Sequence, residues 1–379
     1  RVLYPGHLLR DEVARVPGLH LEGLDMPHVA RTSAPIQLDG TFGEGGGALL
    51  RAALAMSALT QQPFHLTQVR GGTNHPGLDI EDALVVQAMG SSCAAEVVGG
   101  AVGSQSLSFT PTRPLGPVTI QQTGGEVRGR GANGLVVLGS LLPIIARSGV
   151  YTELKVIGET YGNNTLTYDY FAHVTLGAAR RMGLYAYPRQ EVCGFGRENY
   201  GEVYLDVEPS ALQGVEWLVR GTMRRCQALV VTAQLPPTIG ARAVSHLERL
   251  AHFSGLKMRV EAQDVAGSSP GAVVTIWAEF DHGFGGVAVL GARGVRVETV
   301  AQGAFEAIST FLASEATVDA YLADQMLLLG VLAEGRTTFT VPRLTQRLLT
   351  MIWVIKQFSP IHVTVTGTEG RSGSVTIQV

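Results

Sequence analysis

A glycine-rich stretch near residue 44 has the residue types of an anion-binding site. It reads DGTFGEGGGALLR from Asp39, and Gly45 and Gly46 lead into an apolar helical pattern. Glycines leave backbone N–H groups open at a helix start, where geometry and the helix dipole favour an anion. Glu44 lies beside these groups, and Arg51 follows one to two turns later. The stretch therefore predicts a phosphate site that also contains a carboxylate.

Each of these two charges has two interpretations. Glu44 either complements the helix dipole or holds a divalent metal that bridges phosphates. Arg51 is either a solvated charge or a bidentate phosphate clamp. The stretch lacks the Lys and Ser/Thr of a P-loop, and it does not follow the G-x-G-x-x-G spacing of a dinucleotide fold.

A second polar feature interrupts an apolar helical pattern, AYLADQMLLL, at Asp324 and Gln325. Exposed polar residues on a helix are common. Apolar residues flank this pair on both sides, however, so its polar atoms need partners, and a ligand can supply them.

Composition indicates a folded chain of two or three domains rather than a disordered one. The sequence has 379 residues, 45% of them hydrophobic and 16% charged. A net charge of −3 gives no global basic field, so a nucleic acid would have to be bound locally. The chain has three widely spaced cysteines, no apolar leader at residues 1–20 and no apolar run long enough to cross a membrane. These features favour a reduced, cytoplasmic location away from a membrane.

The order of predicted elements indicates repeated α+β modules, each a pair of helices on a sheet, rather than a Rossmann fold. We expect an N-terminal extension at 1–35 with one short helix, a large domain at 36–209 and 285–379, and an inserted small α/β domain at 210–284. Expected helices are 48–59, 81–97, 134–147, 168–182, 214–227, 241–254, 300–313, 317–332 and 343–357. Expected strands include 64–69, 106–111, 117–122, 152–159, 201–209, 228–235, 257–265, 272–280, 337–341, 361–367 and 372–379.

From residue 36 onward the chain resembles the RNA 3′-terminal phosphate cyclase family. The resemblance rests on GEGGG at 43–47, HPGL at 75–78, GSQSLSF at 103–109, GEVYLDVEP at 201–209 and YLADQ at 321–325. It implies units of two helices on a four-stranded sheet with a small inserted domain, similar to the enolpyruvyl transferases.

The resemblance also implies an ATP-dependent reaction at an RNA 3′ end. In the family a histidine takes AMP from ATP and passes it to the RNA 3′-phosphate, which then closes to a 2′,3′-cyclic phosphate. Mg²⁺ or Mn²⁺ assists this covalent route. The same resemblance implies that Glu44 is the acid next to the metal. It implies that Arg51 and Arg70 face phosphates, and that the phosphate at Arg70 is the one of the RNA. The residues that it implies for nucleotide binding are Tyr321, Asp324, Gln325, Gly45 and Gly46.

The chain departs from the family at the catalytic position itself. Arg347 stands where the family has its histidine, and a guanidinium stays protonated and cannot attack phosphorus. Near the phosphate-facing residues, PGLDIEDAL adds three acids, Asp79, Glu81 and Asp82, and Thr73 replaces a basic residue. GRGANG at 129–134, GETYGNN at 158–164 and GFGRENYG at 194–201 also differ from the family pattern. His75 is a poor substitute nucleophile, since a lone loop histidine is usually a surface residue, and His362 is expected to be structural.

Three functions follow from the same residues. One is an RNA 3′-phosphate cyclase, an enzyme of the ATP-dependent ligase class. Another is a non-adenylylating RNA-binding, processing or assembly factor, a pseudoenzyme like the ribosome-biogenesis branch of the family that also lacks the histidine. A third is a different metal-assisted transfer in which Asp79, Glu81 and Asp82 add metal ligands. Expected partners are an RNA 3′ end and a nucleotide, and a homodimer is left open.

Overall fold

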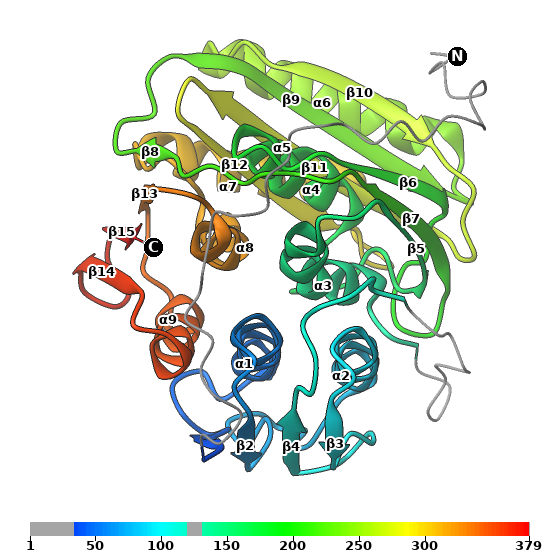
Figure 1. Ribbon diagram of the computed structural model, residues 1–379. Helices are drawn as coiled ribbons and strands as arrows, with labels where there is room; N and C mark the ends of the chain where they lie inside the picture. Colours follow the sequence, from blue (N-terminus) through cyan, green and yellow to red (C-terminus); the bar gives the residue numbers. More distant parts are fainter. Residues whose placement is uncertain (1–33, 120–130, 379) are drawn as a thin grey trace, which may run out of the picture.

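The computed structural model describes residues 34–119 and 131–378. The predicted extension lies outside them except for residues 34 and 35, and the predicted strand at 117–122 lies partly outside. The fold is α+β, as predicted, and helix pairs pack on separate sheets (Figure 1).

The first module contains the glycine-rich stretch. Its sheet has the order β1-β2-β4-β3, with β1 (Ile36–Asp39) parallel to β2 (Phe64–Thr67), and with β4 (Ser106–Thr110) antiparallel to both β2 and β3 (Glu96–Val98). Helix α1 (Gly47–Thr60) is rich in Ala and Leu and buries ten of its residues. Helix α2 (Ile80–Ser92) packs beside it.

The second module is a three-stranded antiparallel sheet, β5-β7-β6, among the described residues. Its strands are β5 (Thr152–Gly158), β6 (Ala186–Val192) and β7 (Gly201–Val207). Buried and less buried residues alternate along β5 and β7, as expected for a sheet with one face on the core. Helix α3 (Gly134–Ser148) covers it, followed by α4 (Tyr168–Tyr170), a π-helical turn η1 (Phe171–Thr175) and α5 (Leu176–Arg181).

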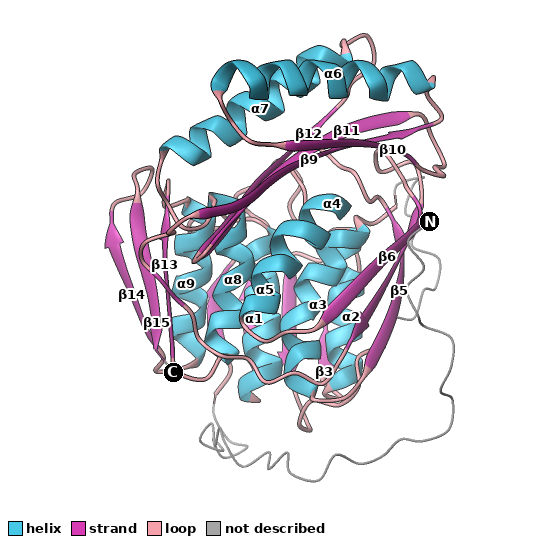
Figure 2. Cartoon of the chain, turned by 90° about the horizontal axis from the view of Figure 1, so that it is seen from above, coloured by secondary structure: helices cyan, strands magenta, loops and turns pink. Residues whose placement is uncertain are grey.

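The inserted unit has the sheet order β10-β9-β11-β12. Its strands are β9 (Met223–Ala233), β10 (Arg259–Asp264), β11 (Gly271–Phe280) and β12 (Gly283–Leu290). Helices α6 (Pro237–Ser254) and α7 (Val297–Ala313) pack together on its outer side (Figure 2). The unit thus continues past residue 284, while β8 (Glu216–Trp217), before it, pairs with a strand of the last module.

The last module has the order β14-β15-β13-β8. Its elements are α8 (Ala320–Leu332), β13 (Arg336–Val341), α9 (Gln346–Phe358), β14 (His362–Gly367) and β15 (Gly373–Gln378). In Figure 2 this sheet and the β5–β6 region lie on opposite sides of a central group of helices.

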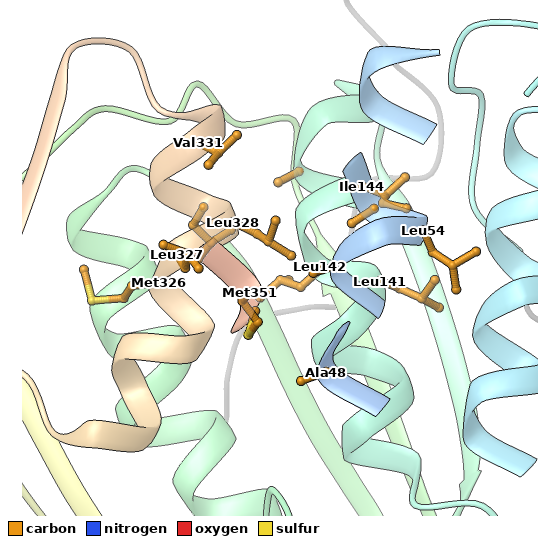
Figure 3. Packing of buried hydrophobic residues seen from close by; sticks show 14 of the residues in the cluster. Ala48, Leu54, Leu141, Leu142, Ile144, Met326, Leu327, Leu328, Val331 and Met351 are labelled. Atoms are coloured by element: carbon orange, nitrogen blue, oxygen red, sulfur yellow. The ribbon is translucent and has the colours of Figure 1, made fainter. Parts of the chain in front are cut away.

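One hydrophobic core joins the three modules through their helices. Figure 3 shows residues of α1, α3, α8 and α9 meeting, among them Ala48, Leu142, Leu327 and Met351. Helix α1 contacts α9 as well as α2 and α3, although almost 300 residues separate α1 from α9. This packing brings the glycine-rich stretch against the C-terminal module.

Some predicted elements were wrong. The predicted helix at 214–227 is instead β8, a turn and the start of β9, because this segment pairs with β13 and β11. In a short apolar run, periodicity alone does not distinguish a helix from a strand. Helix α2 ends at Ser92, five residues before the predicted end, and its chain turns into β3 through Ala94 with φ of 46°. The strands β1, β3, β6 and β12 were not predicted.

Candidate functional site

The glycine-rich loop is held between α9 and a second loop. The Glu44 N–H donates to Thr350 Oγ1 at 3.0 Å, and Thr350 belongs to α9. Gly43 has φ of 62°, and a Cβ there would lie 2.0 Å from the same hydroxyl. Gly45 has φ of 61° and receives a hydrogen bond at its carbonyl from the Gly72 N–H. Glycine is needed here for close backbone approach, which fixes the direction of the Glu44 side chain.

Arg347, which occupies the position of the family's histidine, forms an ion pair with the carboxylate of Glu44 in the glycine-rich loop. Arg347, at the start of α9, donates through Nε and Nη2 to Glu44 Oε1 at 3.0 and 2.8 Å, and through Nε to Oε2 at 3.1 Å. The side chains are 43% and 30% exposed, respectively. The hydrogen bonds to Glu44 raise the pKa of Arg347 above its already high usual value. Residue 347 is therefore a fixed cation.

A buried acid lies near this ion pair. Asp324 on α8 is 6% exposed, and its Oδ1 has no hydrogen-bond partner among the described residues. Burial raises the pKa of Asp324 to about 7; the charge of Arg347 opposes this shift and that of Glu44 adds to it. Tyr321, one turn earlier, is 61% exposed and acts electrostatically on Arg347. The N-cap Asp319 accepts from the Tyr321 N–H and fixes the start of α8.

Next to the glycine loop lies a group of three arginines and three carboxylates, which we call the arginine–carboxylate cluster. Its members are Arg51, Arg70, Arg197, Asp79, Glu81 and Asp82. The Arg51 guanidinium folds back over Gly47, where a Cβ would lie 2.6 Å from Nη1. This contact places the cluster beside the helix start that the sequence assigns to an anion.

Every arginine of the cluster is bonded to a carboxylate. Arg51 pairs with Asp82 at 2.6 Å. Arg70 lies 3.0 Å from Asp79 and 3.5 Å from Asp82, and its backbone adopts φ of 53°. Arg197 reaches Asp79 at 2.9 Å and Glu81 at 2.7 Å, from a loop about 116 residues further along the chain.

The cluster shifts the pKa of two of its acids in opposite directions. Burial works to raise the pKa of Asp79, but hydrogen bonds from Arg70, the Ile80 N–H and Arg197 outweigh it and lower the value to about 2. Burial and the neighbouring charge of Asp79 raise the pKa of Glu81. Asp79 also caps α2 in a capping box with Asp82, so these acids have a structural role.

Comparison with known proteins places this chain in a family. The profile described as RNA 3′-terminal phosphate cyclase matches residues 42–365. A protein named RNA 3′-terminal phosphate cyclase from Gloeothece citriformis is 34% identical over 330 residues, covering 85% of this chain and 93% of its own. Proteins of the same name from Nostoc punctiforme and Methylococcus capsulatus are 32% and 31% identical, covering 87% and 90% of this chain and 96% of their own lengths.

The chain belongs to the RNA 3′-terminal phosphate cyclase family. Among solved structures, the enolpyruvyl transferase NikO from Streptomyces tendae aligns with 91% of this chain and 48% of its own, at 10% identity and a TM-score of 0.35. That score is too low to support an argument. No helix of the described residues has the length and apolar character needed to cross a membrane, and the three cysteines are free and buried.

The family's site residues, as the sequence matches them, fall into two neighbouring groups. Glu44, Arg347, Asp324 and Tyr321 form one, and Arg51 and Arg70 belong to the cluster. The side chain of Gln325 on α8 lies against Gly139 of α3. A Cβ added at Gly139 would be 3.3 Å from Gln325 Oε1. His75 is exposed, and its N–H bonds to Thr73 within its own loop.

Two residues of the site were not singled out from the sequence. Arg197 lies in the GFGRENYG segment, which is flagged only as a departure from the family, and no local pattern links it to Asp79. Thr350 lies in the final helix, and its hydroxyl oxygen accepts a hydrogen bond from the Glu44 N–H. Both contacts join segments distant in sequence, so only the packing of the modules reveals them.

The two implied ligands fit these residues unequally. A divalent metal at Glu44 would have to displace Arg347, which is bonded to both carboxylate oxygens, and the described residues hold no group of three or more His, Cys, Asp or Glu suited to a metal. Asp79, Glu81 and Asp82, offered as extra metal ligands, are engaged by arginines. The present arrangement therefore does not fit a metal at Glu44, whereas the unpartnered oxygen of Asp324 leaves a polar position for a ligand such as a nucleotide.

Proposed function

We propose that this chain is a non-adenylylating member of the family that binds an RNA 3′ end without a covalent AMP intermediate. The observation that carries the proposal is the bidentate hydrogen bonding of Arg347 to Glu44. The residue at the family's nucleophile position is then a permanent cation held against the carboxylate expected to serve the metal.

The chemistry of the guanidinium supports this proposal. Covalent transfer of AMP needs a nitrogen lone pair that attacks phosphorus, as a neutral imidazole provides. Arg347 has no such lone pair at physiological pH, and its bonds to Glu44 raise its pKa further. Its remaining capacity is to bind and orient an anion.

In this proposal a nucleotide still binds beside Tyr321, Asp324 and Gln325. The backbone N–H groups of Gly45 and Gly46 still donate hydrogen bonds to it. In the cyclase alternative, ATP bound there with Mg²⁺ or Mn²⁺ would supply the adenylyl group, with pyrophosphate as the leaving group. A cytoplasmic location, consistent with three free cysteines, belongs to the proposal. The homodimer stays a prediction.

The test is adenylylation of the purified protein with α-labelled ATP and either metal. We expect no acid-labile label on the wild type and no cyclised product from a 3′-phosphorylated oligonucleotide. Label on the wild type, or cyclised product, would overturn the proposal.

Two variants provide the controls. In Arg347→His the imidazole supplies a nucleophile and frees Glu44 from its bidentate partner, so we expect label to appear. Arg347→Gln frees Glu44 without supplying a nucleophile and should stay unlabelled. Label on both variants would point to a nucleophile other than residue 347.

A further inference from the structure

The arginine–carboxylate cluster is not charged as a phosphate receptor should be. Three guanidinium groups face three carboxylates, and each arginine already has a carboxylate partner. The neighbouring Glu44–Arg347 pair is also balanced, while Asp324 and Glu159 add further buried acids. A terminal phosphate, which carries close to two negative charges, would meet no excess of positive charge here.

An incoming phosphate would also have to separate existing pairs. Asp82 is buried completely and Glu81 is 5% exposed. If their arginines turned to a phosphate, these carboxylates would remain buried without a counter-charge, which is strongly unfavourable. The cluster therefore discriminates against a group that only accepts hydrogen bonds.

Two buried atoms of the cluster still lack hydrogen-bond partners. Arg70 Nε is a donor, and Glu81 Oε2 is an acceptor. Glu81 faces the cluster, since its other oxygen accepts from Arg197. Unpaired donors and acceptors in one buried cluster suit hydroxyl groups, because a hydroxyl donates one hydrogen bond and accepts others.

The cluster is partly exposed to solvent. The side chains of Arg51, Asp79 and Arg197 are each about a quarter exposed, at 25%, 24% and 26%. Arg51 lies against the first turn of α1, beside the glycine loop. A chain end bound at that loop would therefore lie next to the cluster.

We propose that this cluster receives the terminal ribose of an RNA that ends in free 2′- and 3′-hydroxyls, and rejects a 3′-phosphate. The proposal rests on the RNA-end binding argued above and names its substrate class. The vicinal hydroxyls donate to carboxylates of the cluster and accept from its guanidinium groups, as carboxylates bind ribose hydroxyls elsewhere. Glu81 is the specificity-determining residue.

The experiment compares one fluorescent RNA oligonucleotide with four different 3′ ends by anisotropy titration at fixed salt. The ends are 2′,3′-dihydroxyl, 3′-phosphate, 2′,3′-cyclic phosphate and 3′-deoxy. For the wild type we expect the dihydroxyl end to bind about tenfold tighter than each of the others, the effect of losing hydrogen bonds to charged groups. Tighter binding of the 3′-phosphate would overturn this inference but leave RNA-end binding intact.

The variant Glu81→Gln removes the charge and keeps the shape. We expect the preference for the dihydroxyl end over the 3′-phosphate to fall to about twofold. Glu298→Gln removes an arginine-bonded glutamate on α7 of the inserted unit and should keep the full preference. An unchanged preference in Glu81→Gln would contradict the role of Glu81.

Two outcomes distinguish a failure of this inference from a failure of the proposed function on which it rests. If none of the four RNAs binds the wild type, the proposed function fails and this inference with it. If Glu81→Gln does not fold, the wild-type comparison of the four ends still decides the substrate class.

Discussion

The Glu44–Arg347 pair and the arginine–carboxylate cluster both join guanidinium groups to carboxylates, but they differ in burial. The first pair is about 30 to 43% exposed and joins two modules whose residues lie 303 positions apart. In the cluster Asp82 and Glu81 are buried, and the arginines are mostly buried too. An exposed pair can open at little cost, whereas a buried cluster resists opening. The first is therefore expected to contribute little to the stability of the fold, and the second to contribute more and to select what binds.

The largest loss of stability should come from breaking the cluster. Asp82→Asn removes the charge that faces Arg51 and Arg70 and weakens the capping box of α2. Because it leaves the part-buried Arg51 without a counter-charge, while Arg70 keeps Asp79, we expect a loss of about 3 kcal/mol in the free energy of unfolding. Urea denaturation measures it. A loss no larger than that of Arg347→Gln would remove the contrast between the two regions.

A second effect should come from the buried acid near the exposed pair. Burial raises the pKa of Asp324 from 3.8 to about 7, so the folded state holds a proton that the unfolded state releases between pH 4 and 7. Stability from this group is therefore present below about pH 4 and is lost as the pH rises to about 7. Asp324→Asn should flatten this decline and stabilise the protein at pH 8 by on the order of 4 kcal/mol.

The measurement is the difference between wild type and Asp324→Asn in unfolding free energy from pH 4 to 8. The difference matters because burial also raises the pKa of Asp169 to about 7, and that group remains in both proteins. Parallel pH profiles for the two proteins would show that the pKa of Asp324 is not raised in the folded protein.

The smallest effect on stability should come from the exposed pair. Arg347→Gln removes the bonds to Glu44 at a site that water reaches, so we expect a change within about 1 kcal/mol, reduced further by added salt. Denaturation at low and high salt measures it. A loss as large as that of Asp82→Asn would show that this pair, too, is a fixed structural element.

The sequence predicted the parts of the site that local patterns specify. Glu44 next to three glycines, Arg51 in the following helix and the Asp324–Gln325 interruption were all visible, as was the presence of arginine at position 347. The α+β modules followed from the recurring order of helices and strands. The short strands β1 and β3 carried too few residues for a pattern, and β9 was taken partly for a helix since its pairing with β11 is not local.

What the sequence did not predict is how the charges pair. From the sequence, the acids Asp79, Glu81 and Asp82 were interpreted as a departure from the family and as additional metal ligands, and the structure pairs them with Arg51, Arg70 and Arg197. Arg197 comes from a loop of another module, and Arg347 from the last helix. Such pairings depend on how the modules pack on one another, which no spacing along the chain encodes.

The most direct test of the account is adenylylation of the wild type and Arg347→His side by side, followed by intact-protein mass spectrometry. The account predicts an AMP adduct on Arg347→His alone, because only that protein has a nucleophilic nitrogen at position 347 and a Glu44 released from its guanidinium partner. An AMP adduct on the wild type would contradict the account.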